Sequence, residues 1–235
     1  MSRKLAKETV LLFIITILMI MPGTGFAGTT IQTNQRIIVI DPGHGGPYSG
    51  LAPSSGMEEK TIVLKLSGKI ARKLESRYNV ILTRTKDTNI SQPERMFIAN
   101  KNLADFFLSI HLHNSKEPSG FFYYYDPPEL GKGEIPAAQN TWKSQPLLHQ
   151  TESRQAVNSF LNIFLAHKKT YRVFSNGAPI ILLEGATMPA ILIEPLSISL
   201  LPQNPDELNN ILDETAAIIV KSIDLYFEKN EGLLN

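Results

Sequence analysis

Short apolar runs alternate along this chain with longer amphipathic segments, and this alternation most constrains its fold. Residues 36–40 form a near-continuous branched apolar run, typical of a parallel strand buried on both faces. We predict strands at 36–40, 78–83, 105–110, 120–125, 179–183 and 190–194, and helices at 58–77, 91–102, 153–167 and 205–227. This order implies an α/β fold of three αβα layers, a mainly parallel twisted sheet of about six strands with helices on both faces.

Two of the predicted helices begin with recognisable capping residues. Ser91 stands three residues before Glu94, which is the spacing of a capping box. Asn204 precedes Pro205, and proline is favoured at the first position of a helix. Residues 126–150 contain several prolines and glycines without a clear period, so we predict a long surface loop there.

The first 27 residues have the composition of a secretory signal peptide. Arg3, Lys4 and Lys7 precede an apolar run over residues 10–21, and Ala27 ends a small-residue cleavage pattern. An uncleaved membrane anchor is the alternative, but the apolar run is shorter than the ~20 residues of a spanning helix. We therefore predict a signal peptide at 1–27, a leader at 28–35, one folded domain at 36–230 and a tail at 231–235.

Composition excludes several classes of protein. The chain has no cysteine, which rules out a lipid-anchored lipoprotein, disulfides and thiolate metal ligands. The formal charge of +1 falls to about −1 once the basic residues and Glu8 of the first 27 residues are removed. A chain with this charge balance has no electrostatic attraction for nucleic acid, so we expect no nucleic-acid partner.

Chemically capable side chains stand at the ends of three predicted strands. His44 follows the strand at 36–40, His111 follows the strand at 105–110, and Glu194 ends the strand at 190–194. Ligands of α/β proteins bind at this edge of the sheet. Glu59, in the first turn of the helix after His44, can reach back toward it. Two imidazoles and a carboxylate suit Zn²⁺, and a further free carboxylate completes the set needed for metal-assisted hydrolysis.

Several alternatives remain open at this site. Glu58 competes with Glu59 for the ligand position. His113 would share a face with His111 if the strand continues, so it is either a ligand or part of the cleft lining. Asn114 and Glu184 are further candidates for the cleft lining, and Glu184 would follow a neighbouring strand.

Aromatic residues offer a second set of alternatives. Tyr123, Tyr124 and Tyr125 fit a sheet, with sugar stacking as the less favoured reading. Trp142 stands in the predicted loop, where it would stack on a saccharide or anchor the loop. His149 and His167 lie in loop and helix context, and we expect both at the surface.

Four motifs in order make the chain resemble the zinc-dependent N-acetylmuramoyl-L-alanine amidases of the amidase-3 type. They are Asp-Pro-Gly-His-Gly-Gly at 41–46, Gly-Met-Glu-Glu-Lys at 56–60, Ser-Ile-His at 109–111 and Met-Pro-Ala-Ile-Leu-Ile-Glu at 188–194. Segments 82–84 and 94–100 also fit, and the resemblance covers residues 37–227.

The resemblance implies a role for each matching residue. His44, Glu59 and His111 become zinc ligands, and Glu194 becomes the catalytic carboxylate. The expected activity is cleavage of the amide between N-acetylmuramic acid and L-alanine of peptidoglycan, in the periplasm or cell wall. We expect a monomer with loops 47–56 and 126–150 along the cleft, and the sequence identifies no activator protein.

The sequence departs from the family pattern at three places. Pro195-Leu196-Ser197 follows Glu194 where the family has a small residue or Leu and then Gly-Phe. Val63 replaces a common Asn, and Glu184 replaces a common Arg. Two alternatives to this activity stay open: a zinc peptidase of other specificity on the same fold, and a catalytically impaired peptidoglycan-binding protein, which only the first departure favours.

Overall fold

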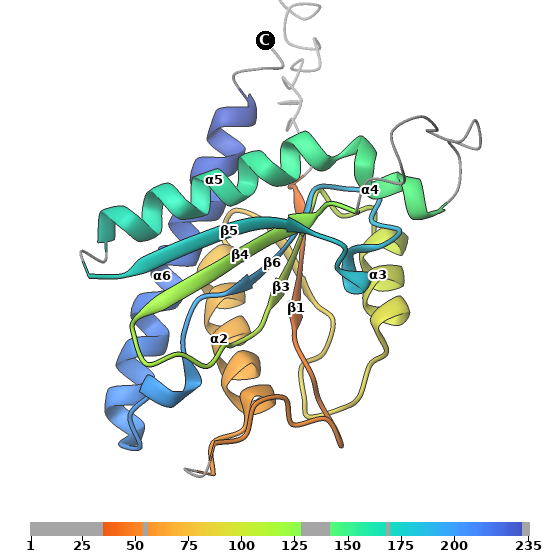
Figure 1. Ribbon diagram of the computed structural model, residues 1–235. Helices are drawn as coiled ribbons and strands as arrows, with labels where there is room; N and C mark the ends of the chain where they lie inside the picture. Colours follow the sequence, from red (N-terminus) through yellow and green to blue (C-terminus); the bar gives the residue numbers. More distant parts are fainter. Residues whose placement is uncertain (1–34, 54–55, 128–141, 168–169, 232–235) are drawn as a thin grey trace, which may run out of the picture. The chain divides into compact units, whose positions relative to one another are not determined.

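Six strands form one sheet in the order β2-β1-β3-β6-β4-β5 in the computed structural model (Figure 1). The structure describes residues 35–53, 56–127, 142–167 and 170–231. The chain divides into two units, Met1–Asn34 and Gln35–Asn235, and every described residue belongs to the second. The predicted signal peptide and nearly all of the leader therefore lie outside the described residues, as do the last four residues of the predicted tail.

The sheet is mainly parallel. Its strands are β1 (Ile37–Pro42), β2 (Asn79–Leu82), β3 (Phe106–Ile110), β4 (Ser119–Tyr125), β5 (Arg172–Ala178) and β6 (Ala190–Glu194). β1 pairs in parallel with β2 and β3, β3 with β6, and β4 with β5, while β4 and β6 are antiparallel. The carboxyl ends of β1, β3 and β6 consequently meet at one edge.

Helices cover both faces, which confirms the predicted three-layer α/β fold (Figure 1). The helices are α2 (Glu59–Leu74), α3 (Gln92–Lys101), α4 (Gln145–Leu148), α5 (Gln150–His167) and α6 (Pro205–Glu231). Alternate strand residues such as Ile38 and Ile40 point into a core with α2, α5 and α6. Val39 and Phe107 point the other way, into a smaller core with α3 and the 3₁₀ helix η2 (Ile181–Leu183).

Both predicted helix caps are confirmed. Ser91 Oγ accepts a hydrogen bond from the backbone N–H of Glu94 at the start of α3. Asn204 Oδ1 accepts from the N–H groups of Asp206 and Glu207 at the start of α6, at 2.9 and 3.1 Å. These bonds satisfy N–H groups that have no partner within the helix.

The fifth strand was predicted in the wrong place. Residues 181–183 of the predicted strand at 179–183 form η2, and the strand lies earlier, at Arg172–Ala178. β5 is an edge strand whose residues are largely exposed, so it lacks the apolar pattern that marks a buried strand.

The predicted loop at 126–150 is wrong in its last part. Its residues 142–144 form the 3₁₀ helix η1 (Trp142–Ser144), and α4 follows. The following helix, α5, begins at Gln150 rather than at Ser153. Residues 128–141 of this segment lie outside the described residues.

None of the helices within the described ranges has the length and apolar character that crossing a membrane requires.

Candidate metal centre

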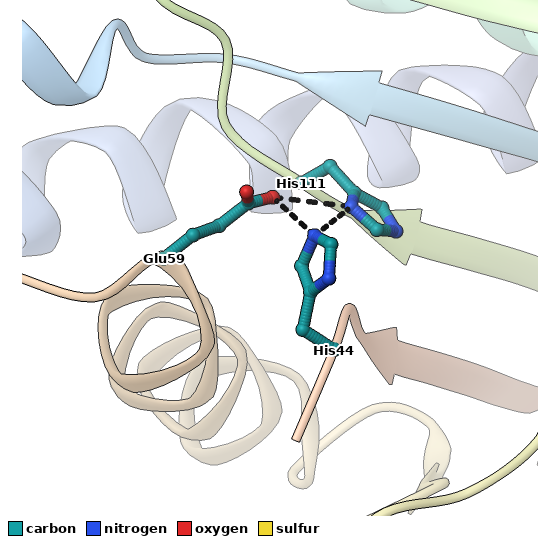
Figure 2. Close-up of side chains that lie close together, drawn as sticks. All are labelled: His44, Glu59 and His111. Carbon is teal, nitrogen blue, oxygen red and sulfur yellow. Dashed lines mark hydrogen bonds and ion pairs between the residues drawn. The ribbon is translucent and has the colours of Figure 1, made fainter. Parts of the chain in front are cut away.

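Three side chains predicted as metal ligands converge at the edge where β1 and β3 end (Figure 2). His44 Nε2 and His111 Nδ1 lie 3.0 and 3.1 Å from Glu59 Oε1, and 3.1 Å from each other. A tetrahedral zinc ion with bonds of about 2.05 Å separates its ligand atoms by about 3.3 Å. The two nitrogens and the oxygen therefore fit three corners of a zinc site.

His44 is presented by a sharply turned backbone. Its φ of 60° lies in the left-handed region, and Gly45 and Gly46 that follow also have positive φ. A residue with a Cβ rarely adopts this conformation, so the surrounding structure must hold it. Reciprocal backbone hydrogen bonds between Gly45 and Tyr48, at 3.0 and 3.2 Å, close the turn.

Two buried arginines hold the carbonyl groups of this turn. Arg95 donates from Nη2 to the His44 carbonyl and from Nη1 to the Pro42 carbonyl, both at 2.7 Å. Arg84 donates to the carbonyls of Pro42 and Gly43, at 2.9 and 2.7 Å. The loop that carries the first ligand is therefore clamped by two guanidinium groups from separate elements.

Asp41 supplies the charge that balances Arg95. Its side chain is fully buried, and its Oδ1 lies 2.7 Å from Arg95 Nη1. Thr83 Oγ1 and Ser109 Oγ donate to the two carboxylate oxygens, at 2.6 and 2.8 Å. A buried ion pair is tolerated when hydrogen bonds satisfy its remaining groups, as they do here.

The sequence contains one indication of this clamp. Arg84 and Arg95 lie in segments 82–84 and 94–100, which fit the family pattern, although that fit alone gives neither arginine a role. Arg95 lies close to the N-terminus of α3, where the helix dipole disfavours a cation. A positive charge at that position indicates a specific acceptor, and the acceptors here are Asp41 and the carbonyls of the turn.

Glu59 is the first residue of α2 and is 2% exposed. The backbone N–H groups of Leu51 and Leu112 donate to its carboxylate oxygens, at 2.8 and 2.9 Å. Burial alone would raise the pKa of Glu59, but hydrogen bonds from the two imidazoles and these amides outweigh it and hold the pKa far below its usual value. Glu59 is therefore an anion at neutral pH.

Glu58, the alternative ligand, points elsewhere. Its Oε1 accepts a hydrogen bond from Ser49 Oγ at 2.9 Å, and its Oε2 lies 3.4 Å from Lys60 Nζ. The three side chains that could hold a metal ion include Glu59 and not Glu58. The geometry favours the register that the sequence predicted.

Glu194 lies at the level of His111 on the neighbouring strand. Ile110 pairs with Ile193, and the backbone N–H of His111 donates to the Ile193 carbonyl at 2.9 Å. Burial, and secondarily the negative charge of Glu59, raise the pKa of Glu194 to about 7. A carboxyl group with that pKa exchanges protons readily near neutral pH.

The remaining histidine of the predicted site is buried beside the cluster rather than in it. His113 is 8% exposed, with its Nε2 atom 2.9 Å from Ser119 Oγ and its ring packed edge-on against Phe121. Burial lowers the pKa of His113, which favours the neutral form of the ring. Asn114, the next residue, is exposed.

Glu184 does not follow a neighbouring strand, so that part of its prediction is wrong. It follows η2 instead and lines a groove with Gln92, Trp142 and Gly185. Burial raises the pKa of Tyr125, and the negative charge of Glu184 raises it further. Glu184 therefore lies near Tyr125, the last residue of β4. Because β4 runs antiparallel to β6, that end lies away from Glu194.

Comparison with known proteins gives a consistent result. Residues 38–223 match the family model described as N-acetylmuramoyl-L-alanine amidase. The endolysin of Bacillus phage SPP1 is 30% identical over 178 residues, which are 74% of this chain and 57% of the endolysin. The amidase AmiA of Escherichia coli K12 is 28% identical over 200 residues, covering 74% of this chain and 68% of AmiA.

Solved structures show the same fold. The catalytic domain of CwlV, an N-acetylmuramoyl-L-alanine amidase from Paenibacillus polymyxa, superposes with a TM-score of 0.62 at 22% identity, covering 83% of this chain and 99% of that domain. The N-acetylmuramoyl-L-alanine amidase of Clostridium difficile 630 gives a TM-score of 0.60 at 26% identity, covering 83% of this chain and 98% of that chain. The chain thus spans nearly all of these two structures but little over half of the phage endolysin.

Proposed function

This chain belongs to the N-acetylmuramoyl-L-alanine amidase family, and from that premise we propose that it is an exported zinc enzyme cleaving the amide between N-acetylmuramic acid and L-alanine of peptidoglycan. The observation that carries the proposal is the convergence of His44, Glu59 and His111 on one point, with Glu194 one strand away. In this reading the first three residues hold Zn²⁺.

A zinc ion held there would polarise the amide carbonyl and make a water molecule more acidic. Glu194 would accept the proton of the attacking water and then give it to the departing amine. Burial, the larger cause of its raised pKa, would still favour the protonated carboxyl beside a bound ion, which supports the second half of that task. Glu59 is suited to the ligand role rather than to proton transfer, because its pKa is far too low to return a proton.

The segment after Glu194 is well packed despite its departure from the family pattern. Leu196 is buried, and Tyr171 Oη donates to the Pro195 carbonyl at 2.6 Å. Ser197 Oγ donates to the Ser115 carbonyl at 2.8 Å and accepts from the Ser115 N–H at the same distance. These contacts anchor the segment outside the metal cluster, which supports the active-enzyme reading over the impaired binding protein.

Export and site of action complete the proposal. The N-terminal pattern supports export across the inner membrane, after which the enzyme would act as a monomer on peptidoglycan in the periplasm or cell wall. N-terminal sequencing of the protein recovered from a cell-envelope fraction would test this. A mature chain that begins at Gly28 is expected, and a chain that retains Met1 contradicts cleavage after Ala27.

The activity is tested by digesting purified sacculi with zinc-loaded protein and analysing the products by mass spectrometry. Free stem peptides that begin with L-alanine are expected, together with intact glycan strands. Internal peptide cuts would identify a peptidase, and binding without products would identify an impaired protein. New reducing sugar ends would contradict the proposal, since glycoside hydrolysis needs two carboxyl groups flanking the bond and Glu59 is committed to the imidazoles.

A further inference from the structure

A polar cavity of about 350 Å³ opens beside the metal cluster. His44 and His111, whose rings lie close together in Figure 2, are both among its lining residues. Tyr48, from the turn after β1, and three residues around the start of α3 form much of the rest: Asn89, Ser91 and Gln92. We propose that this cavity binds the N-acetylmuramic acid ring, the acyl half of the substrate; the inference rests on the proposed amidase function.

The orientation of the scissile amide in the site indicates that the cavity faces the sugar. Glu194 must pass a proton to the nitrogen of the departing peptide, so that nitrogen and the peptide face Glu194. In the sheet, β3 lies between β1 and β6, which places Glu194 on one side of His111 and the end of β1 on the other. The acyl group extends from the amide carbon away from the nitrogen, and therefore toward β1, α3 and the cavity.

The charge state of the cavity favours a neutral ligand. Arg95 lines it, but its guanidinium group is already bonded to Asp41 and to the carbonyls of Pro42, His44 and Ile90, at 2.7–2.9 Å. The neutral polar side chains that also line the cavity are the amides of Asn89 and Gln92 and the hydroxyl groups of Tyr48 and Ser91. Ser91 Oγ already accepts from the N–H of Glu94, so it has its O–H proton to offer a ligand. Such groups match sugar hydroxyls and an acetamido group better than the carboxylates of a stem peptide.

Size and shape agree with one sugar ring. The volume is near the lower end of the roughly 300–1,000 Å³ that small-molecule sites occupy. Tyr48 is 61% exposed, and its aromatic ring offers an apolar surface beside polar groups. Its backbone is fixed by the same reciprocal hydrogen bonds to Gly45 that close the His44 turn, so Tyr48 is carried by the same turn as the metal ligand.

Two substrates with the same scissile amide test the assignment. One is N-acetylmuramoyl peptide, and the other is D-lactoyl peptide, which lacks the sugar ring. Tyr48→Ala and Gln92→Ala should each lower kcat/KM about tenfold for the first substrate, the effect of losing one good contact, and less than about twofold for the second. Phe97→Ala is the matched control, because Phe97 is also 61% exposed but lies further along α3.

Equal losses on the two substrates would overturn the sugar assignment while leaving the amidase function intact. A binding measurement separates the two claims further. N-acetylmuramoyl amide added to metal-free protein should shift the NMR signals of the Asn89 and Gln92 side-chain amides, and Tyr48→Ala should weaken that binding. An unperturbed spectrum overturns the subsite. Binding without cleavage of either substrate keeps the subsite and contradicts the proposed function.

Discussion

The imidazole of His111 occupies the space in which a side chain on residue 43 would lie. A Cβ atom built on Gly43 would come within 2.5 Å of His111 Nε2. The backbone N–H of Gly43 also donates to the Ile110 carbonyl at 3.0 Å. This hydrogen bond holds the ends of β1 and β3 together, so residue 43 cannot move away from His111. The glycine before His44 is therefore required by the other histidine of the cluster.

Gly43→Ala should weaken zinc binding, because His111 must move to admit the methyl group. The expected loss is about 10–100-fold, the range for losing a contact that orients a metal ligand. Competition with a chromogenic chelator measures the affinity. Gly68→Ala is the control, because a Cβ atom built on Gly68 would lie 3.6 Å from its nearest neighbour, Arg72 Nη1. Alanine in place of glycine within a helix adds about 0.5–1 kcal/mol of stability. Unchanged zinc affinity in Gly43→Ala would contradict the arrangement.

His44→Ala and His111→Ala should each lower zinc affinity by more than about 100-fold, since a ligand is removed rather than reoriented. Metal analysis of dialysed protein gives the occupancy. Glu58→Gln should retain zinc, because the Glu58 side chain bonds Ser49 and Lys60. Loss of metal in Glu58→Gln with retention in Glu59→Gln would reverse the ligand assignment.

Glu194→Gln should keep the fold and the metal but lose turnover by about 10²–10⁴-fold, the usual contribution of a general base. The amide is nearly isosteric with the carboxyl group but cannot accept the proton of water. Rates of peptide release from sacculi, compared at equal zinc occupancy, measure the effect. Near-normal digestion by this variant would place the base on another residue.

The same substitution should change how stability depends on pH in the metal-free protein. The folded pKa of Glu194, about 7, exceeds its ordinary value of 4.5, so folding favours the protonated carboxyl. Its contribution to stability is complete below about pH 4.5 and is lost as the pH rises through 7. Glu194→Gln should therefore be more stable than the parent at pH 8 and equal to it near pH 4, by urea denaturation. A constant difference at both pH values would refute the shift.

Arg95→Met should destabilise the protein by about 3–5 kcal/mol, because it leaves Asp41 charged and buried without its cation. Arg172→Met is the matched control: the Arg172–Glu117 pair is as short, at 2.8 Å, but both side chains are about two-thirds exposed. Pairs of that kind contribute about 0–1 kcal/mol. Urea denaturation of both variants compares them, and equal losses would contradict the role given to the buried pair.

The parts of the fold that position the metal cluster could be predicted from sequence. β1, β3 and β6 are buried on both faces, so each reads as a continuous apolar run with a polar residue at its end. That pattern located His44, His111 and Glu194 together. The caps at Ser91 and Asn204 were equally readable, because the bonds they make are local in sequence.

The parts that failed depend on tertiary context. β5 lies at the edge of the sheet with much of its surface exposed, and its sequence carries little hydrophobic signal. η2 is apolar because Leu182 and Leu183 pack against α3, not because it is a strand. The clamp formed by Arg84 and Arg95 joins residues about 40 to 55 positions apart, a separation at which sequence pattern alone assigns no partner.

The three atoms of the metal cluster are contributed by residues 44, 59 and 111, and β2 and α3 lie between the second and the third. The site therefore comes into existence only once β1, α2 and the end of β3 have come together, so the metal can be captured only after this part of the sheet has folded. If the chain crosses a membrane unfolded, it crosses empty. It then takes its ion from the compartment where it folds, and the zinc supply of that compartment sets how much of the protein becomes active.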